Sequence, residues 1–207
     1  YPAARAEVMD ERALEAVCKY EKLEYELRST IFLEFHSSVT PLEDIRQAIQ
    51  ELLEHCGVDA VHFAEDAEQR AEIWKARHNA AHAEPLLRPG AKAMVTDVCV
   101  PLSRLADCIT ETQRDLAETG LCAPIVGHVG DGNFHLAILI DPESKSEIEE
   151  AERLHARLVD RAIGFGGTVS GEHGIGLGKR QYLEGEHGSG LTVMKTIKRA
   201  LDPRDIM

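Results

Sequence analysis

Several features are scarce or missing in this chain of 207 residues, and each absence narrows what the protein can be. Only 5% of the residues are aromatic, and no apolar run reaches the roughly 18 residues needed to cross a membrane. The five cysteines are scattered without a Cys-x-x-Cys pair, which indicates reduced thiols rather than a disulfide framework or a zinc ribbon. With 23 basic against 36 acidic residues, the net charge of -13 argues against a nucleic-acid partner.

The beginning of the chain also lacks a targeting signal. No basic segment followed by an apolar core marks a signal peptide, and the first residue is Tyr1 rather than Met. We therefore expect a fragment of a longer protein, whose targeting sequence would lie upstream. Hydrophobic residues make up 43% of the chain, which is enough for one domain with a sizeable core over residues 1–207.

Apolar periodicity and turn residues predict alternating helices and strands. Helices are expected over residues 10–28, 40–55, 67–83, 102–119, 144–163 and 189–201, and strands over 30–36, 58–63 and 93–100. A hairpin is expected between the fourth and fifth helices. Because this hairpin is antiparallel, the expected fold class is α+β, an antiparallel sheet with helices packed mainly on one face.

The run of residues 127–135, rich in Gly and His, is the most informative segment of the chain. Asp131-Gly132 predicts a two-residue type I′ turn, because such a turn needs positive φ at both central positions. In the resulting register His128 and His135 lie directly opposite each other, with Cβ atoms about 4.5–5.5 Å apart. The other face of the hairpin is mostly apolar and predicts a core. Two imidazoles at this spacing could both reach one metal ion.

The run of residues 170–176 supplies what a bare histidine pair lacks. Glu172 is an oxygen donor, and two histidines with one carboxylate leave coordination positions open, as is typical of catalytic metal sites. His173 is a candidate general base, since Gly171 and Gly174 flank the Glu172-His173 pair and permit a bent backbone that could aim both inward. Lys179 and Arg180 could contact an anion, but simple surface charge is the preferred interpretation. The residues alone also permit ordinary turns and surface histidines, so a purely structural interpretation stays open.

Both runs, together with residues 73–77 and 96–101, resemble the C-terminal domain of the FAD-linked oxidases over the whole chain. Within that family the chain is most similar to the mitochondrial D-lactate dehydrogenases that pass electrons to cytochrome c. The resemblance implies a ferredoxin-like cap domain, FAD bound mainly by a separate N-terminal domain that this chain lacks, and a mitochondrial location. It also implies that the fragment is inactive alone.

Individual roles follow from the same resemblance. A divalent metal, zinc or manganese, would be bound by His128, His135 and Glu172, with His173 as the base. Arg77 would bind the substrate carboxylate.

A cofactor-adjacent position, near the flavin or the substrate, is implied for Asn133. An ordinary turn role for this residue is an equally good interpretation.

The resemblance also concerns the substrate. In relatives that act on a dicarboxylate, polar residues recognise the distal carboxylate at the positions occupied here by Ala81, Val95 and Ala137. A second carboxylate would lack polar partners there, and burying an unpaired charge is costly. The implied reaction is oxidation of D-lactate to pyruvate, with glycolate or D-2-hydroxyglutarate as alternative substrates. Outside this class, a metal-dependent hydrolase could use the same ligands, and a noncatalytic binding module would need no metal.

Overall fold

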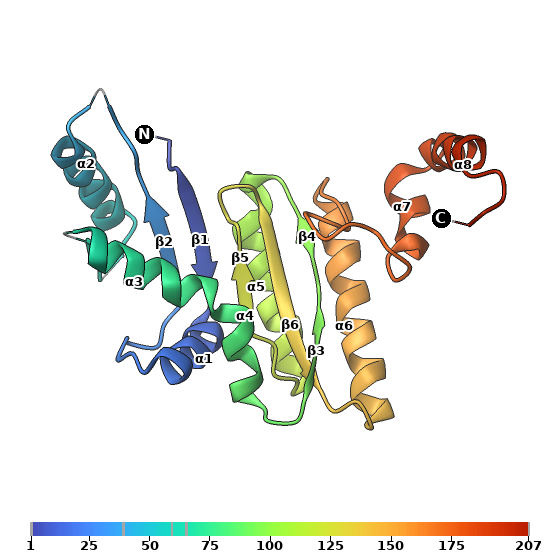
Figure 1. Cartoon of the computed structure of the whole chain (residues 1–207), viewed down its shortest axis with the longest axis horizontal. Coiled ribbons are helices and arrows are strands. Elements are labelled where there is room, and N and C mark those ends of the chain that lie inside the picture. The colour runs from blue at the N-terminus through green and yellow to red at the C-terminus, as the bar shows by residue number, and fades with distance from the viewer. Residues whose placement is uncertain (1, 39, 59, 65, 207) are drawn as a thin grey trace.

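An antiparallel sheet lies at the centre of the molecule (Figure 1). The computed structural model describes residues 2–38, 40–58, 60–64 and 66–206. The strands follow the order β2-β1-β5-β6-β3, and β4 pairs with β6 as well. Their bounds are β1 Arg5–Met9, β2 Thr30–Glu34, β3 Lys92–Val95, β4 Val98–Cys99, β5 Ile125–Gly127 and β6 Asn133–Ile140. The expected α+β class with an antiparallel sheet is confirmed.

The helices begin and end largely where local signals place them. Asp10, Asp66 and Ser144 each accept a hydrogen bond from the backbone N–H three residues on, at the starts of α1, α3 and α6. The helices are α1 Glu11–Glu21, α2 Leu42–His55, α3 Ala67–His78, α4 Ala80–Ala83, α5 Leu102–Thr119, α6 Lys145–Gly164, α7 Leu183–His187 and α8 Gly190–Leu201, with short 3-10 turns η1 Glu84–Leu87 and η2 Arg180–Tyr182. Within the described residues, none of these helices has the length and apolarity to span a membrane.

Some elements differ from the sequence prediction. The strand β1 was not predicted, and the helix expected over 10–28 ends at Glu21 because Lys22 adopts a left-handed backbone at φ 58°. The strand expected over 93–100 is divided into β3 and β4. At the division, the N–H of Leu136 donates a hydrogen bond to the hydroxyl of Thr96 rather than to its backbone carbonyl. This contact interrupts the backbone hydrogen bonds between the two strands.

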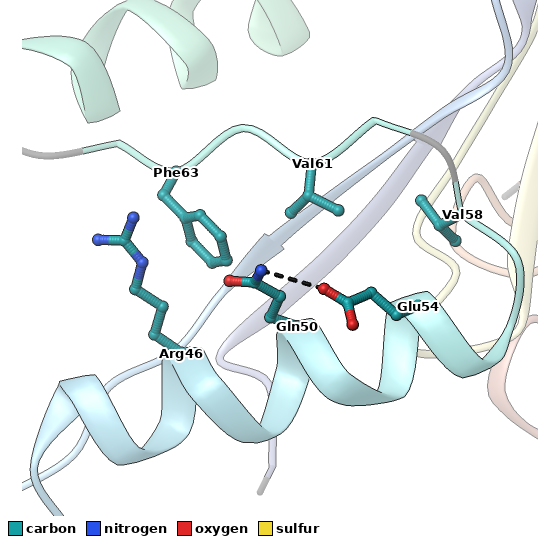
Figure 2. Close-up of a pocket in the computed structure, with 6 residues that line it drawn as sticks. All are labelled: Arg46, Gln50, Glu54, Val58, Val61 and Phe63. Atoms are coloured by element: carbon teal, nitrogen blue, oxygen red, sulfur yellow. Dashed lines mark hydrogen bonds between the residues drawn. The ribbon is translucent and has the colours of Figure 1, made fainter.

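The strand expected over 58–63 does not form at residues 58 and 60–63, and Asp59 lies outside the described residues. These residues instead follow α2, where Val58, Val61 and Phe63 border an open hollow of about 400 Å³ (Figure 2). The guanidinium of Arg46 lies over the Phe63 ring, 4.3 Å from its centroid. None of the candidate metal ligands lines this hollow, so we do not assign the functional site to it.

Strand β6 carries both the main core and the candidate site, because its side chains alternate between two faces of the sheet. Phe134, Leu136 and Ile138 are fully buried beneath α5 and α6, in the same cluster as Ile125 of β5. Asn133, His135 and Ala137 therefore point to the opposite face. Over β5 and β6, the helices of the main core thus cover one face, as expected (Figure 1).

The N-terminal helices pack on the other face, beside the candidate site. Trp74 of α3 is buried with Met9 of β1 in a second cluster that also includes α1 and α4. Val126 of β5 packs against this second cluster, whereas its neighbour Ile125 belongs to the main core. Toward β3 the site face is open, since Val95 is 49% exposed.

The connection between β5 and β6 differs from the predicted hairpin by two residues. Val126, not His128, pairs with His135. The loop consists of residues 129–132 and is closed by the N–H of Asn133, which donates to the carbonyl of His128 at 3.3 Å. Within this loop only Gly132 has positive φ, at 79°, whereas a type I′ turn needs two such residues. Because the shift is an even number of residues, each side chain keeps its predicted face.

Candidate metal centre

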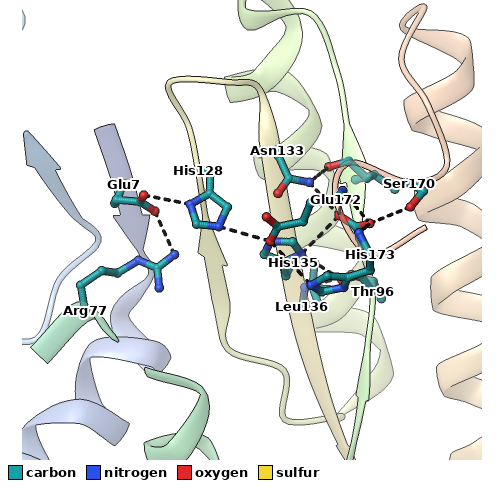
Figure 3. Close-up of polar contacts among 12 residues, drawn as sticks. Glu7, Arg77, Thr96, His128, Asn133, His135, Leu136, Ser170, Glu172 and His173 are labelled. Atoms are coloured by element: carbon teal, nitrogen blue, oxygen red, sulfur yellow. Dashed lines mark hydrogen bonds and ion pairs between the residues drawn. The ribbon is translucent and has the colours of Figure 1, made fainter. Parts of the chain in front are cut away.

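Three side chains from two separate segments converge on the open face of β6 (Figure 3). Nε2 of His128 lies 3.3 Å, and Nε2 of His135 lies 3.2 Å, from the same oxygen, Oε1 of Glu172. Two atoms bound to one ion at roughly 2.1 Å in a tetrahedral arrangement are about 3.4 Å apart. Both nitrogen-to-oxygen separations are therefore those that a shared ion would give, and the ligand atoms of the three sequence-predicted ligands all lie within 4.8 Å of one another.

The other ring nitrogens of the two histidines show which atoms face this point. Nδ1 of His128 lies 2.8 Å from Oε1 of Glu7, and Nδ1 of His135 lies 3.3 Å from the carbonyl oxygen of Thr96. A carboxylate or carbonyl oxygen only accepts, so each Nδ1 carries a proton, and in the neutral ring Nε2 then presents its lone pair. Burial lowers the pKa of His135 despite the nearby Asp97 carboxylate, which favours this neutral ring.

The buried Nε2 of His135 has no hydrogen-bond partner among the described residues, although Oε1 of Glu172 lies 3.2 Å away. Two imidazole lone pairs that face one carboxylate oxygen repel it unless a cation lies between them. This arrangement fits a divalent metal better than a simple ion pair. Two nitrogen ligands and one oxygen ligand leave coordination positions open, which suits zinc or manganese in a catalytic site.

His173 lies beside the three ligands. Its ring stacks on that of His135, with centroids 4.8 Å apart and 15° between the ring planes, and its Nε2 is 3.6 Å from Oε1 of Glu172. About half of the His173 side chain is exposed, in contrast to the buried His135. A proton acceptor next to a metal and open to a substrate would need such a position.

A buried aspartate holds the loop that carries Glu172 and His173. Asp97 accepts hydrogen bonds from the backbone N–H groups of His173 at 2.9 Å and Glu172 at 3.2 Å, and from the Ser170 hydroxyl at 2.9 Å. Burial raises the pKa of Asp97, but the hydrogen bonds from His173, Asn133 and Ser170, with the charge of Lys179, outweigh it and hold the pKa well below its usual range. Asp97 is therefore a charged anchor for the loop.

The loop approaches β6 closely because residue 171 has no side chain. A Cβ on Gly171 would lie 1.9 Å from Nδ2 of Asn133 and 3.0 Å from Oδ1 of Asp97. Asn133 donates from Nδ2 to Asp97 at 2.8 Å, and its buried Oδ1 has no partner among the described residues. Lys179, expected at the surface, is only 11% exposed and donates to the backbone carbonyl of Asp97 at 2.9 Å. Its Nζ also lies 3.3 Å from Oδ2 of Asp97, so the alternative of an anion contact describes Lys179 better than surface charge does.

Arg77 is connected to the cluster through Glu7. Nη2 of Arg77 donates to Oε2 of Glu7 at 2.9 Å, while Oε1 of the same carboxylate faces Nδ1 of His128. The buried Nε of Arg77 has no partner within the described part of the chain. Sequence reasoning missed Glu7, because 121 residues separate it from His128 and no local pattern marks it.

Comparison with known proteins identifies the family of this chain. The model for the C-terminal domain of FAD linked oxidases matches residues 1–207. The chain belongs to this family. A probable mitochondrial D-lactate dehydrogenase of Danio rerio is 45% identical over 207 residues, which cover 100% of this chain and 42% of the relative. The mitochondrial D-lactate dehydrogenase (cytochrome) of Arabidopsis thaliana is 40% identical over 206 residues, covering 99% of this chain and 36% of the relative.

More distant proteins share the same FAD-linked oxidase domain or its fold. Glycolate oxidase subunit GlcD of Bacillus subtilis is 30% identical over 207 residues, covering 99% of this chain and 44% of the relative. The solved structure of 4-ethylphenol oxidase from Gulosibacter chungangensis, in its isoeugenol complex, has a TM-score of 0.66 at 14% identity. The structural match covers 98% of this chain and 46% of the oxidase chain, and it supports the fold.

This FAD-linked oxidase domain spans less than half the length of these relatives. FAD is the cofactor of the family, and the expected mitochondrial location agrees with the names of the D-lactate dehydrogenases. The hydrolase and binding-module alternatives find no support among these relatives.

Proposed function

We propose that this FAD-linked oxidase domain is the substrate- and metal-binding part of an FAD-dependent dehydrogenase that oxidises D-lactate to pyruvate. Zinc or manganese would be bound by His128, His135 and Glu172. The observation that carries the proposal is the pair of Nε2 atoms aimed at one oxygen of Glu172. It occurs in a family whose members include D-lactate dehydrogenases 40% and 45% identical to this chain.

Each functional side chain has one task in the proposed reaction. The metal, when bound, supplies Lewis acidity that polarises the 2-hydroxyl group. His173 takes the hydroxyl proton, since its ring lies beside the ligands and is half exposed. Arg77 binds the substrate carboxylate with the planar N–H donors that Glu7 leaves free. FAD, held mainly by a separate domain, supplies the redox chemistry as acceptor of the Cα hydride.

The surroundings of His135 favour a small monocarboxylate substrate. Ala137 follows His135 on the same face of β6, and Val95 of β3 pairs directly with Ala137. This apolar pair offers no partner to a second carboxylate, so D-lactate fits better than D-2-hydroxyglutarate. D-lactate is preferred over glycolate because the D-lactate dehydrogenase relatives are more similar than the glycolate oxidase subunit, at 45% and 40% against 30% identity.

The proposal extends to the partners of the domain. These are its own FAD-binding domain, a small 2-hydroxy acid and cytochrome c as the electron acceptor, in keeping with the name of the Arabidopsis relative.

Elemental analysis of the whole protein that carries this chain tests the metal site. We expect zinc or manganese close to one ion per chain in the wild type and little in His135→Ala. His55→Ala is the matched control, because His55 lies at the end of α2 and is not among the side chains gathered at the candidate metal centre. The same trace of metal in wild type and His135→Ala would refute the metal site.

A second variant separates the base from the ligands. His173→Ala should retain its metal, while kcat for D-lactate falls by about 10²–10⁴, the usual contribution of a general base. Normal turnover in this variant would remove His173 as the base and leave the metal site standing.

A further inference from the structure

Glu7 of β1 joins two parts of the candidate site that come from distant elements (Figure 3). Its Oε1 lies 2.8 Å from Nδ1 of His128, and its Oε2 accepts a hydrogen bond from Nη2 of Arg77 at 2.9 Å. We propose that Glu7 is a positioning residue that fixes both the metal-facing nitrogen of His128 and the guanidinium of Arg77. The inference rests on the proposed function and adds to it a residue that is neither a metal ligand nor a substrate contact.

The pairing of strands places Glu7 in this position. β1 and β5 pair in an antiparallel register that, continued by one residue, sets Glu7 opposite His128. The loop that follows is fastened to β1 as well, since the N–H of Gly130 donates to the carbonyl of Ala6 at 3.1 Å. The contact between Glu7 and His128 is therefore set by backbone pairing on both sides of it.

The contact with His128 decides which ring nitrogen is available to a metal. The Glu7 carboxylate accepts a hydrogen bond from Nδ1–H, so in the neutral ring the lone pair on Nε2 points toward Glu172. A carboxylate behind a ligating histidine fixes the tautomer and orientation of the ring and raises its basicity. Without Glu7 the ring could turn or adopt the other tautomer, and the metal would lose a well-oriented ligand.

The contact with Arg77 decides where a substrate carboxylate would be bound. Arg77 and Glu7 are only 13% and 14% exposed, so water competes little for this ion pair. A planar guanidinium held through Nη2 presents its remaining N–H groups on the side away from Glu7. Metal affinity and carboxylate recognition would consequently depend on the same side chain.

Competition with a chromophoric chelator, performed on the whole protein that carries this chain, measures its affinity for Zn²⁺. Glu7→Ala should lower this affinity by about 10–100-fold. Glu7→Gln should lower the Zn²⁺ affinity less. Its amide oxygen can still accept a hydrogen bond from Nδ1–H, although the charge is gone. Circular dichroism and a urea midpoint establish that each variant is folded. If Glu7→Ala does not fold, Glu7→Gln carries the test.

Glu34→Gln is the matched control for the loss of charge. Glu34 of β2 is similarly buried, at 12% exposure, and lies beside a histidine and an arginine, His36 and Arg5, outside the site. Its replacement should leave the Zn²⁺ affinity unchanged. A fall equal to that of Glu7→Gln would show that any lost carboxylate weakens binding, and would overturn the inference.

Arg77→Ala distinguishes positioning from a general loss of packing. It removes one partner of Glu7 but keeps the contact with His128, so Zn²⁺ affinity should be retained. In Glu7→Gln, by contrast, both Zn²⁺ affinity should fall and KM for D-lactate should rise. Equal affinity in wild type and Glu7→Ala, or equal losses in Glu7→Ala and Arg77→Ala, would overturn the role of Glu7. A wild type that binds no Zn²⁺ or Mn²⁺ would instead overturn the proposed function.

Discussion

At the scale of single residues, a buried charge and a missing side chain together position the loop 170–173. Asp97 is fully buried and receives hydrogen bonds from the backbone of Glu172 and His173. Gly171 permits this approach, because its backbone packs against Asn133 and Asp97 where a Cβ has no room. The placement of Glu172 therefore depends on steric fit as much as on attraction.

Replacement of Gly171 tests this steric requirement. Gly171→Ala would place a Cβ 1.9 Å from Nδ2 of Asn133, so the loop or the asparagine must move. We expect unfolding free energy to fall by about 1–3 kcal/mol, the usual cost of overpacking, and metal affinity to fall with it. Urea unfolding and Zn²⁺ titration measure the two effects.

Gly178→Ala is the control, because no atom lies within 4 Å of a Cβ at that position. It should leave both quantities close to those of the wild type. Wild-type metal affinity in Gly171→Ala would mean that the close approach does not position Glu172.

At the scale of elements, local signals predicted helices well and strand partners poorly. The helix over 102–119 ends at Gly120 as expected, because a glycine stop acts on its own neighbours. The hairpin register was wrong by two residues, since the four-residue loop is set by contacts with β1 that the loop sequence does not contain. Alternation within β6 was nevertheless enough to predict which side chains share a face.

The apolar pair on β3 and β6 gives a prediction about substrate choice. Val95→Lys would add a cation two residues from Asp97, on the open face of the sheet. The ratio of kcat/KM for D-2-hydroxyglutarate over D-lactate should rise by up to about fivefold, the contribution of a partly exposed ion pair. Steady-state kinetics of the whole protein measure this ratio.

Ala93→Lys places the same charge on the same face of β3, two residues further from His135 along the register. It should change the ratio less than Val95→Lys does. Equal ratios in both variants would place the distal end of the substrate elsewhere, and a wild type that prefers D-2-hydroxyglutarate would refute the proposed selectivity.

At the scale of the whole molecule, the sheet separates the main core from the second core. The site lies on the same face of the sheet as the second core, between that core and the open part of this face. Composition and the hairpin were sufficient to predict the α+β class. Three of the residues gathered at the site, His128, His135 and Glu172, could be proposed from residue type and spacing. Glu7 could not, because its position depends on strand pairing between the two ends of the chain.

A buried carboxyl in the second core makes the stability of the molecule depend on pH. Glu84 is 5% exposed, and burial raises its pKa from 4.5 to about 7, against the opposing attraction of Arg77. A raised pKa stabilises the folded state below pH 4.5, and this contribution is lost as pH rises through about 7. Over this range the loss amounts to about 3 kcal/mol.

Glu84→Gln should remove this dependence, because the amide does not titrate. Urea unfolding at pH 5 and pH 8 compares the variant with the wild type. We expect similar stability at pH 5 and an advantage of about 3 kcal/mol for the variant at pH 8. A difference that is the same at both pH values would show that Glu84 does not titrate in this range.

The alternation of β6 has a consequence for how the gene can change. Phe134 and Ile138 lie in the main core, whereas His135 and Ala137 face the site. One strand register determines the face on which each of the four side chains lies. An insertion or deletion of a single residue that slid the strand would turn both faces over at once. Such alleles would be eliminated because the protein fails to fold, before any loss of chemistry could be selected against. Purifying selection on the core thus also preserves the alignment of the histidines.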